Sequence, residues 1–199
     1  RKINFKGIGS KNISDAWIVN LYKDCVSIID QFSLDLSTEF SQTYRHNGVD
    51  LNCHRHMSIF KKNNIIPEFC FGCYKVQVEP RTIIELIKLL VIFDRIDLEE
   101  NNIRKCMVEV RPNVSGFYKG FIYCSNLKQA NQISTIINKK INKSIGLGLY
   151  SKVKRGCSEY PLSFPDYEDI NHFGPQLMNY QNAWKKIEAN YDRQNLSQQ

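Results

Sequence analysis

Four residues with metal-binding side chains stand in two pairs near the middle of the chain. Cys53 and His56 are separated by two residues, as are Cys70 and Cys73, and thirteen residues lie between the pairs. Two such pairs can place four soft donors tetrahedrally around Zn²⁺, and this number of protein ligands leaves no open position for a substrate. The spacing therefore predicts a structural zinc site, with His54 as an alternative to His56. The other interpretation is that the cysteines are buried free thiols.

Two further stretches, far apart in the sequence, contain groups that could act in catalysis. His54 and His56 flank Arg55, and a histidine that titrates near neutral pH can serve as a general acid or base. Cys157 follows residues 154–156, of which two are basic and one is glycine. A turn of this composition can bind an anion and activate a thiol, although a single cysteine is more often inert.

The residues from 119 to 123 form a third candidate site. A basic residue, a glycine, an aromatic residue, a variable residue and a second aromatic residue follow one another as Lys119, Gly120, Phe121, Ile122 and Tyr123. In this pattern the chain resembles the RNA recognition motif family, over roughly ninety residues with the same order of elements. The resemblance implies that RNA bases stack on Phe121 and Tyr123. Ile122 stands where the family usually has a small residue.

Alternation along the predicted strands places basic and aromatic side chains together on one face of a sheet. Cations on such a face neutralise phosphates, and exposed rings offer platforms for bases. The residues predicted to bind nucleic acid are Lys75, Arg111, Lys119, Phe121, Tyr123, Lys152 and Lys154. The alternatives are a solvated face with salt bridges or a face covered by the terminal helices.

The pattern of apolar residues predicts an α+β core between residues 69 and 160. Alternation with a period of two predicts strands, and apolar residues at helical spacing predict helices. In chain order these are a strand at 73–78, a helix at 82–94, strands at 106–111 and 117–124, a helix at 125–141 and a strand at 149–157. The order β-α-β-β-α-β is that of the ferredoxin-like fold, whose two helices cover one face of a four-stranded antiparallel sheet.

Helical extensions are predicted on both sides of this core. Residues 1–68 contain an amphipathic helix at 14–32 and then an irregular segment. Residues 161–199 contain a loop and a second amphipathic helix at 176–191. Each of these helices needs a surface on which to bury its apolar stripe.

Composition limits the classes to which the chain can belong. Its 199 residues suffice for one sizeable domain with extensions, and a hydrophobic content of 42% is ordinary for a globular core. No run approaches the roughly 18 apolar residues of a membrane span. The net charge of +7 and the pI of about 9.0 favour nucleic acid or another anionic partner.

Cysteine usage and missing motifs narrow the classes further. The chain has seven cysteines, an odd number, and no secretory signal, which predicts reduced thiols and a cytoplasmic protein. The phosphate-binding, dinucleotide-binding, esterase and zinc-protease motifs are absent from the sequence, so those classes of enzyme are disfavoured.

Together these observations predict a single-stranded RNA-binding module with a structural zinc. The first alternative is an enzyme of the nuclease or transferase type that acts on an anionic or phosphorylated substrate, in a pocket between the sheet and a terminal extension. The second alternative is a subunit that docks on a partner protein through its terminal helices, which carry Trp17 and Trp184.

Overall fold

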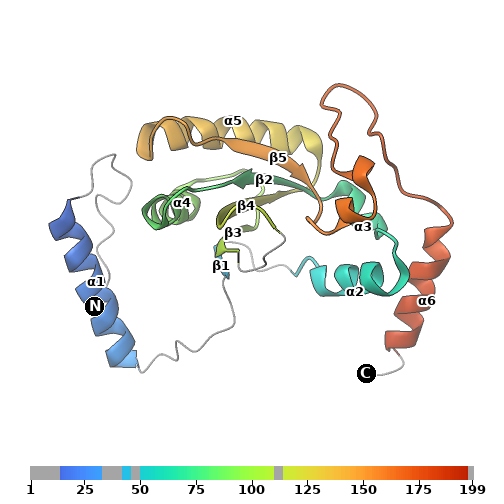
Figure 1. Ribbon diagram of the computed structural model, residues 1–199, viewed down its shortest axis with the longest axis horizontal. Coiled ribbons are helices and arrows are strands. Elements are labelled where there is room, and N and C mark those ends of the chain that lie inside the picture. The colour runs from blue at the N-terminus through green and yellow to red at the C-terminus, as the bar shows by residue number, and fades with distance from the viewer. Residues whose placement is uncertain (1–13, 33–41, 46–49, 110–113, 197–199) are drawn as a thin grey trace. The chain divides into compact units, whose positions relative to one another are not determined.

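The computed structural model describes residues 14–32, 42–45, 50–109 and 114–196, with only the backbone described for Asp15, residues 42–45 and Leu196. Its helices are α1 (Asp15–Phe32), α2 (Cys53–Asn63), α3 (Glu68–Gly72), α4 (Ile83–Arg95), α5 (Leu127–Ser144) and α6 (Trp184–Leu196). Its strands are β1 (Gln42–Arg45), β2 (Tyr74–Val78), β3 (Arg104–Val108), β4 (Tyr118–Cys124) and β5 (Ser151–Arg155). Two short 3-10 helices, η1 (Tyr160–Leu162) and η2 (Pro165–Tyr167), follow β5 (Figure 1). Within these residues, no helix is long and apolar enough to cross a membrane.

The strands of the described residues form one sheet in the order β1-β3-β4-β2-β5. β3 pairs antiparallel with both β1 and β4, so that Cys106 lies opposite Thr43 on one side and Gly120 on the other. The predicted mixed fold with a four-stranded antiparallel sheet, formed by β2 to β5, is confirmed. The sequence does not predict β1, because its residues lie in a stretch without a clear apolar period.

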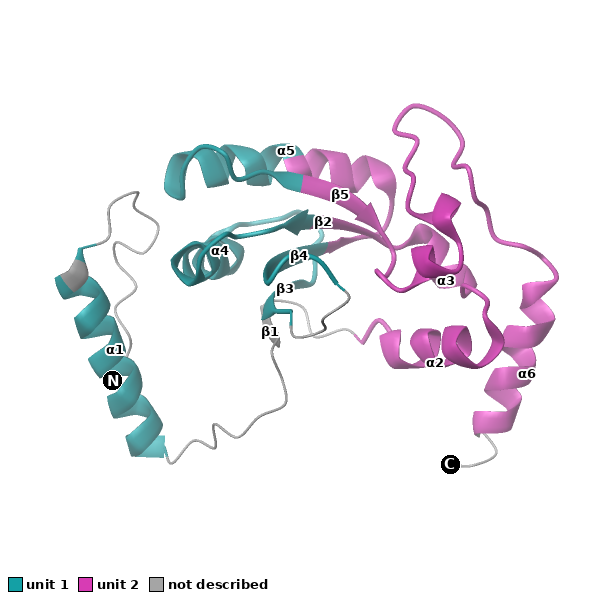
Figure 2. Ribbon diagram, viewed as in Figure 1, with its two compact units in different colours: residues 1–47, 77–122, 135–151 teal, residues 48–76, 123–134, 152–199 magenta. Residues whose placement is uncertain are grey.

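The chain divides into two compact units, which Figure 2 shows in different colours. Unit 1 consists of residues 1–47, 77–122 and 135–151, and unit 2 consists of residues 48–76, 123–134 and 152–199. Unit 1 contains α1 and α4, whereas unit 2 contains α2, α3 and α6. The boundaries predicted from the sequence after residues 68 and 160 stay a prediction.

Helix α4 begins where the sequence predicts it, at a capping box. The side-chain oxygen of Thr82 accepts a hydrogen bond of 3.2 Å from the backbone N–H of Glu85. The Glu85 carboxylate accepts one of 2.7 Å from the backbone N–H of Arg81 and pairs with its guanidinium, and these contacts lower the pKa of Glu85. Two backbone donors at the helix start are thereby satisfied. From this start α4 buries Leu89 and Phe93 completely.

Arg104, at the start of β3, satisfies the other end of α4. Its side chain is only 1% exposed and donates to the carbonyl oxygens of Phe93, Ile96 and Asn102. The last carbonyls of a helix have no partner within the helix, and a guanidinium with five N–H groups can serve several of them. Burial lowers the pKa of Arg104, but an arginine remains charged at any physiological pH. This cation therefore serves the fold rather than a ligand.

The two central strands, β2 and β4, are buried on both faces, so the predicted open face is not found along them. All five residues of β2 and six of the seven residues of β4 are buried. Polar side chains on the expected open face are paired there: Lys119 Nζ lies 3.4 Å from a carboxylate oxygen of Glu109, and Gln77 donates to Glu79. Pairing of this kind lets polar side chains leave water. Alternation of polar residues in these strands therefore does not mark solvent.

The segment predicted to be irregular contains helices α2 and α3. The residue before α2, Asn52, has a φ of +53°, and its backbone N–H donates to Asp50 at 2.8 Å. Only His56 and Ile59 of the eleven residues of α2 are fully buried. The apolar period is therefore too weak to predict this helix from the sequence.

The last helix begins at Trp184 rather than near Gln176. Side-chain amides bond to nearby backbone in the intervening segment. Gln176 Nε2 donates to the carbonyl oxygen of Asn171 at 2.7 Å, and Asn179 Nδ2 donates to that of Gln176 at 3.2 Å. Such local bonds offer the backbone an alternative to a helix.

Replacement of Gly120 tests the packing of α4 on β4. A Cβ atom there would collide with Leu89 and lie 3.0 Å from the ring of Phe93. We expect Gly120→Ala to lower the free energy of unfolding by roughly 1–3 kcal/mol, the usual cost of overpacking a core.

The matched control is Gly72→Ala in α3, where a Cβ atom would lie 3.9 Å from the nearest neighbouring atom. Alanine is the better helix former, so this variant is expected to be as stable as wild type or slightly more stable. Urea unfolding measures both variants, and equal stability of the two would contradict the packing described.

Candidate thiol–lysine site

Lys75 is a cation buried inside unit 2. It is the second residue of β2 and is only 7% exposed, although the alternation of the strand predicts an outward side chain. Its Nζ atom lies 3.7 Å from Sγ of Cys157 and 5.1 Å from the centroid of the Tyr123 ring. An ammonium group out of water is costly unless negative charge or a ring face compensates it.

Two opposing effects decide the protonation state of Lys75. Burial by itself lowers its pKa, because burial disfavours the charged form. In decreasing order, Cys157, Tyr123, Cys73 and Cys53 raise it, and together they outweigh burial, so that the pKa lies above that of a free lysine. The pKa of Lys75 is therefore raised, and three cysteine side chains are among the groups that raise it.

The cysteines near Lys75 differ in their access to solvent. Cys53 is exposed, Cys73 and Cys157 are half-buried, and Cys70 is buried. Burial raises the pKa of Cys70 to about 12 and that of Cys73 to about 11, and Lys75 counteracts part of the rise in each case. Both of these thiols are protonated at neutral pH. Cys157, in contact with Lys75, is the candidate nucleophile.

A glycine turn places Cys157 beside Lys75. The backbone N–H of Gly156 donates to the carbonyl oxygen of Cys73 at 2.8 Å, which extends the pairing of β5 with β2. Gly156 has a φ of +55°, a left-handed conformation that glycine adopts without steric cost. A Cβ atom there would lie 2.7 Å from ring atoms of Tyr167. The path of the chain into Cys157 therefore requires glycine.

Arg155 supports this turn from inside unit 2. It is 3% exposed, and its guanidinium donates to the carbonyl oxygens of Phe71 at 3.2 Å and Met178 at 2.9 Å. The ring centroids of Phe71, Tyr167 and Tyr74 lie 5.0, 5.0 and 5.8 Å from its central carbon. Both the N–H groups and the face of the guanidinium are thus occupied. Arg155 serves the turn rather than an anion.

The turn rests on a cluster of aromatic side chains. Tyr160 and Tyr167 are fully buried, and their rings meet edge to face with centroids 5.4 Å apart. Both bond to Cys70: the Tyr160 hydroxyl shares a hydrogen bond of 3.2 Å with its thiol, and the Tyr167 hydroxyl donates to its carbonyl oxygen at 2.6 Å. Burial raises the pKa of both phenols, so they remain neutral. This cluster fixes the residues on either side of the site.

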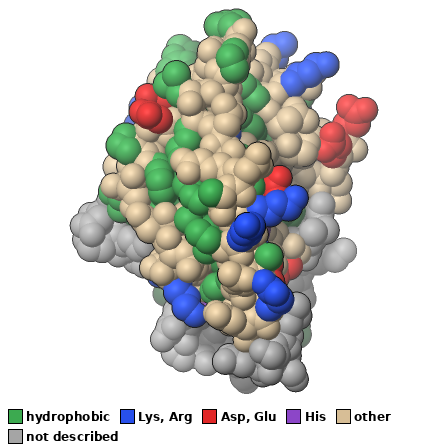
Figure 3. All heavy atoms as spheres, turned by 90° about the vertical axis from the view of Figure 1, so that its right-hand side faces the viewer, with side chains coloured by type: hydrophobic (Ala, Val, Ile, Leu, Met, Phe, Trp, Pro, Cys, Tyr) green, Lys and Arg blue, Asp and Glu red, His purple; other side chains and the backbone are tan. Residues whose placement is uncertain are grey.

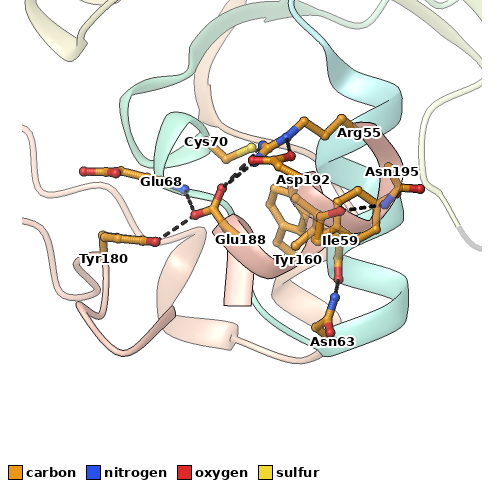
Figure 4. A network of polar contacts seen from close by, with 11 residues as sticks. Arg55, Ile59, Asn63, Glu68, Cys70, Tyr160, Tyr180, Glu188, Asp192 and Asn195 are labelled. Atoms are coloured by element: carbon orange, nitrogen blue, oxygen red, sulfur yellow. Dashed lines mark hydrogen bonds and ion pairs between the residues drawn. The ribbon is translucent and has the colours of Figure 1, made fainter. Parts of the chain in front are cut away.

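An ion-pair network joins α2 to α6 (Figure 4). Arg55 donates to Asp192 through Nε at 2.6 Å and Nη2 at 2.7 Å, and it lies 3.3 Å from Glu188. Glu188 also accepts from the Tyr180 hydroxyl at 2.8 Å and from the backbone N–H of Glu68 at 2.9 Å. The two-pronged contact raises the pKa of Arg55 and lowers that of Asp192. Through these bonds α6 holds both helices that precede β2.

The structure does not assemble the zinc site predicted from Cys53, His56, Cys70 and Cys73. His56 is buried with its ring stacked on Phe69 at 5.0 Å, and burial lowers its pKa. His54, the alternative ligand, is exposed. Among the described residues, no group of three or more His, Cys, Asp or Glu side chains is placed to hold a metal ion. Zinc binding stays a prediction without support from the structure.

Most residues predicted to bind nucleic acid are buried. Lys75, Lys119, Phe121 and Tyr123 are between 2% and 9% exposed, so they do not stand on an open face. The ammonium groups of Lys105 and Lys75 lie 5.7 and 5.1 Å from the ring centroids of Phe121 and Tyr123. Cations therefore occupy ring faces on which bases would have to stack.

The remaining members of that set are more varied. Lys152 is exposed. Lys154 donates to the hydroxyl of Ser158 at 2.7 Å and lies 3.8 Å from the carboxylate of Glu168. Arg111 lies outside the described residues.

The pair of Lys75 and Cys157 is the feature that the sequence does not reveal. The two residues are 82 positions apart, and no local pattern connects them. The basic residues beside Cys157 in the sequence indicate a reactive thiol, but Arg155 donates to the carbonyl oxygens of Phe71 and Met178. The cation in contact with Cys157 is Lys75, from β2. The available signal is a lysine between two buried residues of β2, Tyr74 and Val76.

Comparison of the chain with protein family models, with curated proteins and with solved structures found no match. The site is therefore interpreted from its own chemistry: a half-buried thiol, an ammonium group in contact with it, and a second half-buried thiol beside the neighbouring strand.

The bond between Arg55 and Asp192 predicts a pH dependence of stability. The pKa of Asp192 is lowered in the folded protein, so its contribution is present above the unfolded pKa and is lost as the pH falls through the folded pKa. We expect Asp192→Asn to lower the free energy of unfolding by about 0.5–1 kcal/mol at neutral pH, a size typical of partly exposed pairs. The difference should disappear near pH ~2.

Urea unfolding at the two pH values measures this effect. Asp169→Asn, which removes an exposed carboxylate of the same unit, is the control and is expected to change stability little at either pH. A deficit for Asp192→Asn that is equally large in acid would contradict the ion pair.

Substitution of Gly156 tests the turn at the site. Gly156→Ala meets both an unfavourable φ and a collision with Tyr167, and we expect it to lower the free energy of unfolding by roughly 2–4 kcal/mol. Gly148→Ala is the matched control: its φ is +86°, but a Cβ atom there would lie 3.5 Å from Arg81. Thermal or urea unfolding should show the smaller loss for Gly148→Ala, and the reverse order would refute the collision.

Proposed function

We propose that the protein is an enzyme that uses Cys157 as a nucleophile, with Lys75 as the counter-ion of its thiolate. The observation that carries this proposal is the 3.7 Å contact between Nζ of the buried Lys75 and Sγ of Cys157. Reactive cysteines occupy electropositive, partly exposed surroundings. Cys157 is half-buried and has an ammonium group as its neighbour.

Electrostatics favour the charged form of this pair. Two opposite charges about 4 Å apart attract by on the order of 4 kcal/mol at an effective dielectric constant near 20. Loss of hydration offsets part of this attraction, because burial costs several kcal/mol for each ion. Lys75 is already out of water, whereas Cys157 keeps some contact with it. The thiolate therefore gains the attraction at a modest cost in hydration.

A thiolate in this setting attacks an electrophilic carbon or phosphorus atom and forms a covalent intermediate. Once its sulfur is bonded, the sulfur is neutral, and the Lys75 charge becomes available to stabilise a negative charge on the substrate or leaving group. This arrangement favours substrates with an anionic or phosphorylated group, in keeping with the net charge of +7. Transfer or hydrolysis of such a substrate is the reaction class we propose.

The scaffold that we propose for this site is a ferredoxin-like core. The sheet order β3-β4-β2-β5 supports it, since β2 and β4 are the central strands and α4 and α5 follow them in the chain. A fold of this kind serves many functions, so the proposed activity depends on the site alone.

Single-stranded RNA binding is a second candidate, and charge is what favours it. Helix α5 has no acidic residue, and its exposed lysines are Lys128, Lys139, Lys140 and Lys143. On the face drawn in Figure 3, however, lysine and arginine side chains are scattered rather than gathered in one patch. Stacking of bases on Phe121 and Tyr123 would require these buried rings to leave the core. The thiol site is the better supported of the two.

The rate of alkylation at Cys157 tests the proposed nucleophile. Iodoacetamide reacts with thiolates rather than thiols, so the rate at neutral pH reports the thiolate fraction. We expect Lys75→Met to slow the alkylation of Cys157 about tenfold, which corresponds to a loss of about 1.4 kcal/mol of thiolate stabilisation. Quenched time points followed by peptide mass mapping give a separate rate for each cysteine.

The control is Lys128→Met, which removes the same charge from an exposed position on α5. This variant should alkylate at the wild-type rate. If Cys157 reacts equally fast in both variants, Lys75 is not its counter-ion and the proposal fails.

A further inference from the structure

We propose that Cys73 is the resolving partner of Cys157 and that the two thiols reduce hydroperoxides. This inference rests on the proposed nucleophilic Cys157. It adds a second reacting residue and a second reaction of the same sulfur, the reduction of a peroxide with an accessible oxygen–oxygen bond, beside the transfer or hydrolysis proposed above.

Backbone pairing brings the two thiols together. The 2.8 Å hydrogen bond from the Gly156 N–H to the Cys73 carbonyl oxygen places these residues side by side, and Cys157 is the next residue after the left-handed turn. Residues opposite one another in antiparallel strands, here Cys73 and Gly156, have Cα atoms about 4.5–5.5 Å apart. Cys157 is one residue further along, and a disulfide between it and Cys73 requires a Cα distance of about 4.4–6.8 Å. Both thiols are half-buried, so a small oxidant can reach the pair.

The charges at the site favour reaction of Cys157 with the peroxide before Cys73 reacts. In the reduced site burial raises the pKa of Cys73 most, Lys75 lowers it, and the charge on Cys157 raises it again. Oxidation of Cys157 to a sulfenic acid removes its negative charge, whereas the ammonium group of Lys75 remains. The ammonium then favours the thiolate of Cys73 with no anion on Cys157 to oppose it. The pKa of Cys73 is therefore lower after Cys157 has reacted than before, while burial still raises it.

Both steps balance in atoms and electrons. The Cys157 thiolate attacks the terminal oxygen of the hydroperoxide; a sulfur–oxygen bond forms, the oxygen–oxygen bond breaks, and the departing alkoxide takes up a proton and leaves as an alcohol. The Cys73 thiolate then attacks the sulfenic sulfur; a disulfide forms, and hydroxide leaves and becomes water with the proton that Cys73 has released. The two thiols supply the two electrons, and a small-molecule thiol restores them by exchange.

Three neighbouring groups could take the place of Cys73. Cys70 is buried, and its thiol shares a hydrogen bond with Tyr160, so it is poorly placed to attack. Lys75 is an ammonium ion and has no free electron pair to offer. Cys53 is exposed at the start of α2 and influences the charge on Lys75, so it is the rival that an experiment has to separate.

The test treats the full-length reduced protein with one equivalent of hydrogen peroxide, in the presence and absence of dimedone, which traps sulfenic acids. Peptide mass mapping without reduction then locates the product. In wild type we expect a disulfide between Cys73 and Cys157, with the loss of two hydrogen atoms. In Cys73→Ser we expect a stoichiometric dimedone adduct on Cys157. Cys53→Ser should form the same disulfide as wild type.

The outcomes separate the inference from the proposed function on which it depends. A dimedone adduct on Cys157 in wild type without a disulfide, or a disulfide that persists in Cys73→Ser and is lost in Cys53→Ser, would overturn the role of Cys73 while leaving Cys157 a nucleophile. No oxidation of Cys157 in any of these proteins would count against both. The wild-type result stands by itself if a variant fails to fold.

Discussion

An ammonium group removed from water needs negative charge or electron density close by, and this requirement organises the interior of the protein. Five lysine and arginine side chains are buried in the described structure, and four of them meet the requirement in different ways. Arg104 donates to helix carbonyls, Arg155 lies among carbonyls and ring faces, and Lys119 pairs with Glu109. Lys75 instead lies against a thiol and a phenol ring. Of the four, only this last solution places a potential nucleophile at the cation.

The other contacts of unit 2 hold that pair in register. Gly156 turns the chain into Cys157, and Tyr167 blocks any other residue at the turn. The same tyrosine bonds to the backbone of Cys70, three residues before Cys73, so that one aromatic side chain ties both sides of the site together. The ion pairs of Arg55 with Asp192 and Glu188 hold α2 against α6. A site built in this way is preorganised, since its groups need little rearrangement before they react.

Local patterns explain which parts of the fold could be predicted from the sequence. The capping box at Thr82 and the two-residue alternation around Val76 are read within a few residues, and the helix and strand lie where these signals place them. α2 carries too few buried apolar residues to show its period, and the true start of α6 depends on side-chain amides that bond to the backbone. A sequence pattern does not show which part of the protein packs against a strand.

The same missing information explains why the sequence does not predict the candidate site. Alternation correctly assigns Lys75 and Tyr123 to the second face of the sheet, but not that this face is buried. The pattern therefore predicts a solvent-exposed Lys75 and an open ring at Tyr123, whereas both side chains are buried. The sequence points to Cys157 through the two basic residues and the glycine before it, whereas the cation that it contacts lies 82 residues away. Contacts between residues so far apart in the chain depend on the order of the strands in the sheet. Local periodicity does not reveal that order.

The ultraviolet absorption of thiolates at neutral pH tests the central claim most directly. Wild type should absorb more than Cys157→Ser by the contribution of one thiolate, and this difference should be lost when Lys75 is replaced by methionine in both proteins. Identical absorption of wild type and Cys157→Ser at neutral pH would show that Cys157 is an uncharged thiol, and it would contradict the ion pair from which the proposed chemistry follows.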